Sequence, residues 1–162
     1  MLAAVGLIAC GVAASGCGYS TSSLMPAGVR TISVPVFDND TFRRSIEVQL
    51  TKAVHSEILT RTSLKLTETH LADSILEGTI TRVDQPVAAE DERDRITTQD
   101  VFVTVKFTWK DLRTGEVIHA VEGLSTSDSI VVPLGQNLEL AIERALGKMA
   151  EAIVNEMEFR DW

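Results

Sequence analysis

A regular alternation of apolar and polar residues predicts most of the strands in this chain. It is strongest over 101–110, where every odd-numbered residue is apolar and most even-numbered residues are polar. Successive side chains of a strand point to opposite faces of a sheet, so this period of two is typical of a strand with one buried face. Weaker alternations over 30–37, 64–67, 74–83 and 117–125 predict four more strands.

Two other segments carry apolar residues at helical spacing. Over 44–61 these residues recur at every fourth position: Ile46, Leu50, Val54 and Ile58. Over 137–158 the stripe is longer and is formed by Leu138, Ile142, Ala145, Leu146, Met149, Ile153 and Met157. Each stripe predicts an amphipathic helix with one buried face. Gly147 lies inside the second helix, where it costs about 1 kcal/mol relative to alanine.

The segments between these elements predict turns and loops. An Asp/Asn cluster at 38–41 predicts a turn with side chains that cap the first helix. The run 86–95 is highly charged with both signs, and it predicts a solvated loop. Residues 113–115 (Arg-Thr-Gly) predict the tight turn of a hairpin.

The order strand, helix, four strands, helix predicts an α+β fold. The first helix connects two parallel strands, and the short later turns make the remaining strands antiparallel. The economical arrangement is a two-layer sandwich, with two helices packed on one face of a mixed, mostly antiparallel four- to five-stranded sheet. The other face would carry Phe102, Thr104, Lys106 and Thr108 and would remain open.

The N-terminal residues 1–16 are apolar or small and carry no charge. At about 1.5 Å per residue they are too short to cross a bilayer core of about 30 Å, and they resemble a secretory signal sequence. Ala14-Ser15-Gly16 followed by Cys17 resembles the lipobox of bacterial lipoproteins. We therefore expect a signal peptide at 1–16, a lipidated flexible tether at 17–28 and a single α+β domain at 29–162.

Two alternatives concern the cysteines. Cys10 follows Leu7-Ile8-Ala9, a second lipobox-like sequence, but only nine residues precede it. The other alternative is an ordinary buried N-terminal segment, with or without a disulfide between Cys10 and Cys17. We favour Cys17 as the lipid attachment site. Two or three acyl chains would anchor the protein stably. The residue after Cys17 is Gly18 rather than Asp, and in this the chain resembles lipoproteins that are sorted to the outer membrane. There the domain would face the periplasm.

Charge and composition narrow the function classes. The chain has 23 Asp and Glu against 15 Lys and Arg, a net charge of −8. Nucleic-acid binding requires a basic surface that displaces counterions, so we exclude nucleic acid as a partner. Hydrophobic residues make up 44% and charged residues 23% of the chain, which is ordinary for a globular domain.

No group of residues in the sequence predicts catalysis or metal binding. His55, His70 and His119 are scattered without metal-ligand spacing. Neither a glycine-rich phosphate loop nor a nucleophile elbow is present. We therefore expect no cofactor, no metal and no catalytic residue, and we interpret the chain as a binding or assembly protein rather than an enzyme. A small envelope hydrolase is the enzymatic alternative.

Several short segments, in this order, resemble the lipopolysaccharide (LPS)-assembly lipoprotein family, LptE. They are CGY at 17–19, GVRTISVPV at 28–36, FDNDTF at 37–42, LTKA at 50–53, ADSILEG at 72–78, DLRTGEV at 111–117 and the C-terminal amphipathic helix. The family usually has Asn-Arg-Thr where this chain has Asn39-Asp40-Thr41. The resemblance spans nearly the whole chain after Cys17.

The resemblance implies a non-enzymatic role in the outer membrane. Such proteins sit as a plug inside the LptD β-barrel, where they assist barrel assembly and the insertion of LPS into the outer leaflet. The implied partners are therefore an LptD-type barrel, LPS and the membrane that holds the lipid anchor. The alternative is a lipoprotein subunit or activator of another envelope machine, such as a peptidoglycan-synthase activator or a secretion-pore component.

An LPS-binding site would need cations, because the lipid A phosphates are bound best by Lys and Arg. The candidates are Lys106 and Lys110 on the open sheet face and Arg113 at the hairpin turn. Phe102 on the same face suits an amphipathic ligand. The alternative is that these three residues are ordinary solubilising charges.

The first prediction is lipidation of Cys17. Mass spectrometry of the mature N-terminus should detect acylated Cys17 and no peptide from 1–16, because signal cleavage removes the leader after the thiol is modified. Substitution of Cys17 by serine should abolish both the acylation and the cleavage, whereas Cys10→Ser should leave them unchanged. An intact, unmodified leader in the wild type would contradict the prediction.

Overall fold

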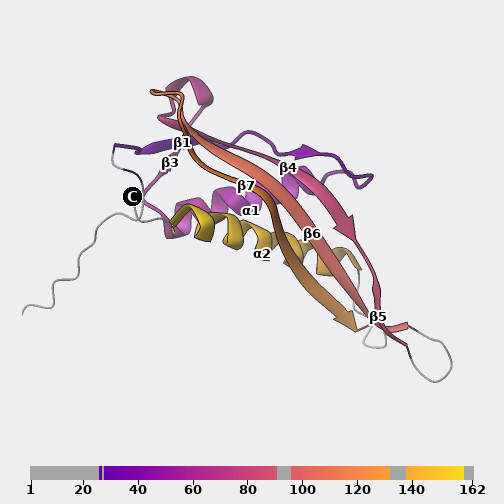
Figure 1. The fold of residues 1–162 in the computed structure, drawn as a ribbon. Helices are drawn as coiled ribbons and strands as arrows, with labels where there is room; N and C mark the ends of the chain where they lie inside the picture. The colour runs from indigo at the N-terminus through magenta and orange to yellow at the C-terminus, as the bar shows by residue number, and fades with distance from the viewer. Residues whose placement is uncertain (1–25, 27, 91–95, 132–137, 159–162) are drawn as a thin grey trace, which may run out of the picture.

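Two helices pack side by side on one face of a twisted mixed sheet (Figure 1). This is seen in a computed structural model, which describes residues 26, 28–90, 96–131 and 138–158. The long strands are β4 (Ser74–Asp84), β6 (Ile96–Asp111) and β7 (Val117–Val131). The short strands are β1 (Thr31–Ser33), β2 (Asp38–Asn39), β3 (Lys65–Leu66) and β5 (Val87–Glu90). The helices are α1 (Ile46–Arg61), α2 (Leu138–Glu158) and the 3₁₀ turn η1 (Thr69–Leu71).

Strand β6 organises the sheet. Strands β4 and β7 both pair with it antiparallel over residues 102–110, so they lie on its opposite sides. Beyond β4, strand β1 pairs parallel with β4 and with β3, while β2 pairs parallel with the middle of β4. Helix α1 thus connects parallel strands, as the sequence predicts. The predicted two-layer α+β fold is confirmed.

The core lies between the sheet and the two helices. The odd-numbered residues of β6 from Val101 to Trp109 are at most 2% exposed, whereas Phe102 and Lys106 are exposed on the other face. The apolar stripes of α1 and α2 cover the buried face. One continuous core cluster contains the residues that the strand and helix periodicities place together, among them Val103, Val105, Phe107, Ile46, Leu50, Ile142 and Leu146.

The two helices run parallel and are joined at their C-terminal ends. Arg61, the last residue of α1, donates hydrogen bonds to the Asn155 amide and, at 3.0 Å, to the Glu158 carboxylate in the last turn of α2. Both N-terminal ends therefore lie at the other end of the helix layer. This parallel arrangement determines which side chains can face each other between the helices.

Two sequence-based expectations need correction. The predicted turn at 38–41 contains β2, because the backbone of Asp38 and Asn39 pairs with β4. Its polar side chains still shape the turn: the Asn39 side-chain oxygen accepts the Thr41 N–H at 2.9 Å, and its amide donates to Glu47 at 2.8 Å. The predicted loop at 86–95 contains β5, and 91–95 lie outside the described residues.

Strands β6 and β7 are also longer than their alternation predicts, at 16 and 15 residues. The extension of β7 beyond residue 125 runs through Ser127 and Ser129, which have weak strand preference. These residues pair with Phe102 and Asp100 of β6. Backbone pairing with β6 therefore overrides local propensity. The expected signal peptide and most of the expected tether at 17–28 lie outside the described residues.

The second prediction concerns Gly78, where the Phe37 ring lies directly against the β4 backbone. A Cβ atom at Gly78 would overlap the Phe37 ring, which is itself buried in the core. Gly78→Ala should therefore lower the free energy of unfolding by about 1–3 kcal/mol, measured by denaturant titration. Gly123→Ala is the matched control, since nothing lies within 4 Å of the point that its Cβ would occupy. Adding Phe37→Leu to Gly78→Ala should recover part of the loss; an additive double variant would contradict the overlap.

Candidate functional site

The open face of the sheet carries a shallow hollow of about 290 Å³. Lys106 and Lys110 line it, so the structure brings these two predicted site residues together. Lys110 Nζ lies 2.8 Å from a Glu77 carboxylate oxygen. Within the described part of the chain, Lys106 has no ion pair. Of the two, Lys106 is therefore the cation that is available to an anionic ligand.

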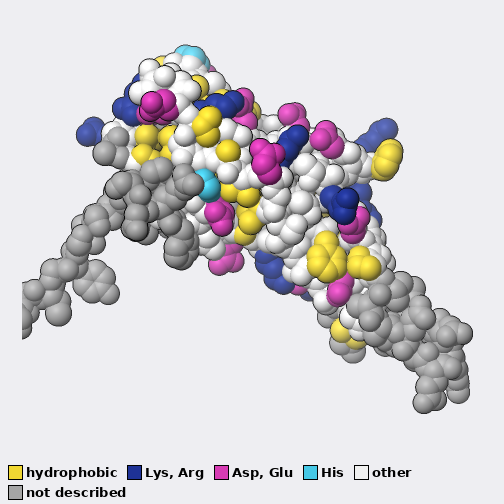
Figure 2. All heavy atoms as spheres, viewed as in Figure 1, with side chains coloured by type: hydrophobic (Ala, Val, Ile, Leu, Met, Phe, Trp, Pro, Cys, Tyr) yellow, Lys and Arg dark blue, Asp and Glu magenta, His cyan; other side chains and the backbone are white. Residues whose placement is uncertain are grey.

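The surroundings of Lys106 limit what the hollow attracts. Asp38, Glu77 and Glu122 also line it, so carboxylates outnumber the two lysines. Figure 2 shows charges of both signs interspersed over the visible surface, without a broad patch of one sign. Capture of an anion here depends on a direct contact with lysine rather than on a long-range field.

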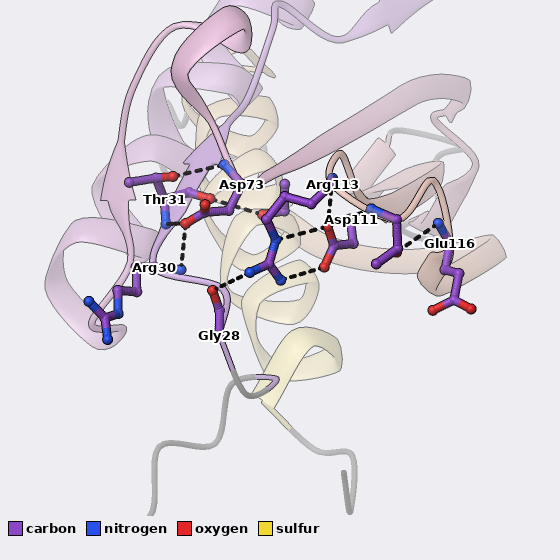
Figure 3. Close-up of polar contacts among 9 residues, drawn as sticks. Gly28, Arg30, Thr31, Asp73, Asp111, Arg113 and Glu116 are labelled. Atoms are coloured by element: carbon purple, nitrogen blue, oxygen red, sulfur yellow. Dashed lines mark hydrogen bonds and ion pairs between the residues drawn. The ribbon is translucent and has the colours of Figure 1, made fainter.

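Arg113, the third predicted cation, is held in a separate network at the hairpin turn (Figure 3). Its guanidinium donates to both carboxylate oxygens of Asp111, at 3.2 and 2.6 Å, and to the Gly28 carbonyl at 2.9 Å. Arg113 does not line the hollow that contains Lys106 and Lys110. The network therefore links the N-terminal end of the described domain, at Gly28, to the turn between β6 and β7.

Asp111 is the acceptor at the centre of this network. Its side chain is 11% exposed and also accepts the backbone N–H groups of Arg113 and Thr114, at 2.8 and 3.3 Å. The hydrogen bonds from the Arg113 side chain, aided by these backbone donors, outweigh the cost of burial and lower the pKa of Asp111 to about 2. The carboxylate therefore stays charged throughout the physiological pH range.

A second carboxylate, Asp73, joins the same end of the sheet. Its Oδ2 accepts the backbone N–H groups of Arg30 and Thr31, each at 3.0 Å, and these contacts together with the Thr31 hydroxyl lower its pKa (Figure 3). The Asp73 carbonyl accepts the Leu112 N–H at 2.8 Å. Three segments far apart in sequence are thus joined here, which gives Arg113, Asp111 and Asp73 a structural role.

A larger groove, of about 880 Å³, opens between the N-terminal halves of α1 and α2. Its floor is formed by core residues Ile46, Ile142 and Leu146. The other lining residues are Arg43, Arg44, Gln49, Lys52 and Ala53 on the α1 side, and Glu139, Glu143 and Gly147 on the α2 side. This groove was not predicted from the sequence. The available signals were the Arg43-Arg44 pair before a helix and a glycine inside one.

The three histidines have structural surroundings. His55 Nε2 lies 3.0 Å from the Val34 carbonyl, and His119 Nε2 lies 3.2 Å from a Glu156 carboxylate oxygen. His70 is exposed. Across the described residues, no group of three or more His, Cys, Asp or Glu is placed to hold a metal. Nor does any helix there have the length and apolar character needed to cross a membrane.

The sequence matches the model of the LptE family, described as lipopolysaccharide-assembly, over residues 29–157. The chain belongs to the LptE family. This match covers every strand and helix of the structure except the last residue of α2. The match therefore spans almost the whole described domain, and the family that it identifies is an LPS-assembly lipoprotein family with no enzymatic activity. In sequence, no curated protein matches the chain.

Solved structures share this two-layer α+β fold. The hypothetical protein CT253 from Chlamydia trachomatis superposes with a TM-score of 0.58 at 9% identity, covering 80% of this chain and 96% of that chain. Lipoprotein B from Nitrosomonas europaea gives 0.58 at 9% identity, covering 83% and 84%. Rare lipoprotein B from Shewanella oneidensis gives 0.52 at 12% identity, covering 79% and 93%. At these identities the likeness shows the fold alone.

The third prediction follows from the lowered pKa of Asp111. A carboxylate whose folded-state pKa lies below its unfolded value stabilises the fold above the unfolded pKa, and this contribution disappears as pH falls from about 4 towards 2. Asp111→Asn should therefore lower the free energy of unfolding at pH 7, and its difference from wild type should shrink over that pH interval.

Denaturant titrations at pH 7, 4 and 2.5 measure this difference. The control is Glu77→Gln, which breaks the exposed pair with Lys110 and should cost roughly 0–1 kcal/mol. A difference between Asp111→Asn and wild type that stays constant down to pH 2.5 would contradict the assigned charge interaction.

Proposed function

We propose that this protein is an outer-membrane lipoprotein, facing the periplasm, that assists assembly of an LptD-type β-barrel and insertion of LPS into the outer leaflet. The observation that carries the proposal is the family match over 29–157, which spans the domain rather than a single motif. The barrel partner and the outer-membrane location are properties of the family that we extend to this chain as part of the proposal.

The open sheet face supports a role inside a barrel. The interior of a wide membrane barrel is polar, so a plug needs a polar surface with hydrogen-bonding side chains. On this face Thr104 and Ser125 share a hydrogen bond of 2.9 Å, and Ser129 donates to Asp100 at 2.6 Å. No described helix covers the face. It can therefore meet a polar wall without burying unpaired groups.

Attachment at Cys17 would place the domain close to the membrane. The described chain begins at the end of the sheet where Arg113 binds the Gly28 carbonyl. Residues 17–28 extend at most roughly 40 Å, so a lipid on Cys17 keeps this end of the sheet within that distance of the bilayer surface. Such a tether leaves the domain free to enter a barrel from the periplasmic side.

For LPS contact we propose Lys106 as the principal phosphate-binding residue. It has no ion pair in the described part of the chain, whereas Lys110 must leave Glu77 before it binds a phosphate. Arg113 must likewise leave Asp111 and Gly28. The free energy lost when these contacts break offsets part of the free energy gained on binding the phosphate. The contributions to LPS binding should therefore decrease from Lys106 to Lys110 to Arg113.

The fourth prediction tests this function in two measurements. Affinity purification of the full-length protein from its own envelope should recover an LptD-type barrel. Binding of purified LPS should weaken about tenfold or more in Lys106→Glu, since a hydrogen bond to a charged group contributes about 1.5–3 kcal/mol. Lys65→Glu makes the same charge change at another exposed lysine and should bind LPS like the wild type.

The two measurements test different parts of the proposal, so one part can be contradicted while the other stands. Recovery of a peptidoglycan synthase or a secretion pore in place of the barrel would overturn the proposed function and favour the alternative envelope machine. Recovery of the barrel with equal LPS binding by wild type and Lys106→Glu would overturn the site and leave the barrel partnership standing.

A further inference from the structure

The groove between the helices is a concave site that lies away from the open sheet face. Its volume of about 880 Å³ falls within the range of roughly 300–1,000 Å³ that small-molecule sites occupy. The helices close tightly at their C-terminal ends, where Arg61 binds Asn155 and Glu158. The opening is therefore confined to their N-terminal halves.

The two walls of the groove carry opposite charges. Arg43, Arg44 and Lys52 line the α1 side, and Glu139 and Glu143 line the α2 side. Across the described residues, Arg43, Arg44, Lys52 and Glu143 take part in no ion pair, although pairing between the walls would neutralise them. Ser45, with a positive φ of 69°, turns the chain so that the arginine pair precedes α1 at this groove. The site thus presents separated positive and negative groups to a ligand.

The floor and one wall leave room for an apolar chain. The floor residues Ile46, Ile142 and Leu146 belong to the core, so an alkyl chain placed against them extends the core. Gly147 lines the groove, and nothing lies within 4 Å of where its Cβ would be. Alanine would favour the helix by about 1 kcal/mol at such a position. Glycine therefore keeps the space open at a cost to the helix.

We propose that this groove binds a zwitterionic phospholipid with a primary ammonium group, of the phosphatidylethanolamine class. The phosphate would bind Arg43, Arg44 and Lys52, the ammonium group would face Glu143, and an acyl chain would lie along the floor. The eleven residues that line the groove are few beside the roughly 20–30 residues per side of a typical stable protein interface, which favours a lipid over a protein occupant. This inference goes beyond the proposed function, and its test requires neither LptD nor LPS.

The fifth prediction uses dihexanoyl phosphatidylethanolamine, a soluble short-chain lipid, titrated into the purified full-length lipoprotein in nonionic detergent. Calorimetry should show binding at least about fivefold tighter than for dihexanoyl phosphatidylglycerol, which lacks the ammonium group. Arg44→Gln combined with Lys52→Gln should weaken both lipids. Glu143→Gln should remove the preference and leave phosphatidylglycerol binding as strong as in the wild type or stronger.

Gly147→Leu tests the groove itself. The added side chain fills open space on a helix that leucine favours, so the protein should fold at least as well as wild type and bind phosphatidylethanolamine more than about tenfold more weakly. Glu151→Leu, one turn later on α2 and outside the groove lining, is the matched control and should keep the affinity. The double variant Lys106→Gln and Lys110→Gln, on the sheet face, should also keep it.

Each other result overturns the proposal. Equal affinity for the two lipids in the wild type would make the groove an anion site without a role for Glu143. Unchanged binding by Gly147→Leu would move the lipid elsewhere. A concentration-dependent dimer that Gly147→Leu disrupts would make the groove an interface between copies of this chain. If the wild type binds neither lipid, the groove is not a phospholipid site.

Discussion

The two faces of β6 are the constraint on which the rest of the structure depends. Its odd-numbered residues from Val101 to Trp109 are buried in the core between the sheet and the helices, and its even-numbered residues from Phe102 to Lys110 form the middle of the open face. A shift of one residue in its pairing would exchange the two faces and move Lys106 into the core. Since β4 and β7 both pair with β6, its register also determines where the hollow and the hairpin turn lie.

This division gives the domain two kinds of surface. The sheet face is hydroxyl-rich and of mixed charge, and it suits a polar wall or a phosphorylated glycolipid. The helix face has a groove with an apolar floor and charged walls, and it suits a smaller amphiphile. The ion-pair network of Arg113 with Asp111 stands at one end of both layers and orders the entry of the chain. Under the two proposals, the sheet face would contact the barrel while the groove between the helices holds a lipid.

Much of the fold could be predicted because it depends on local periodicity. The helical stripes over 44–61 and 137–158 and the alternation over 101–110 each indicate which face is buried, whatever the partner element. The candidate site was less predictable. Lys106 and Lys110 share a strand face and could be placed together by the period of two. Arg113 could not be placed, because its partner Gly28 lies 85 positions away in sequence.

The sequence by itself therefore determined the two long helices, the long strands, their buried faces, the family and the acidic net charge, since these follow from the order and composition of residues. Only the tertiary structure decided how the elements meet. It decided that the helices run parallel, joined at their C-terminal ends and leaving a groove between their N-terminal halves, because this packing brings together side chains that are 94 and 97 positions apart in sequence. It also decided that Arg113, paired locally with Asp111, reaches the Gly28 carbonyl as well. No local pattern encodes that contact, because it joins residues 85 positions apart in sequence.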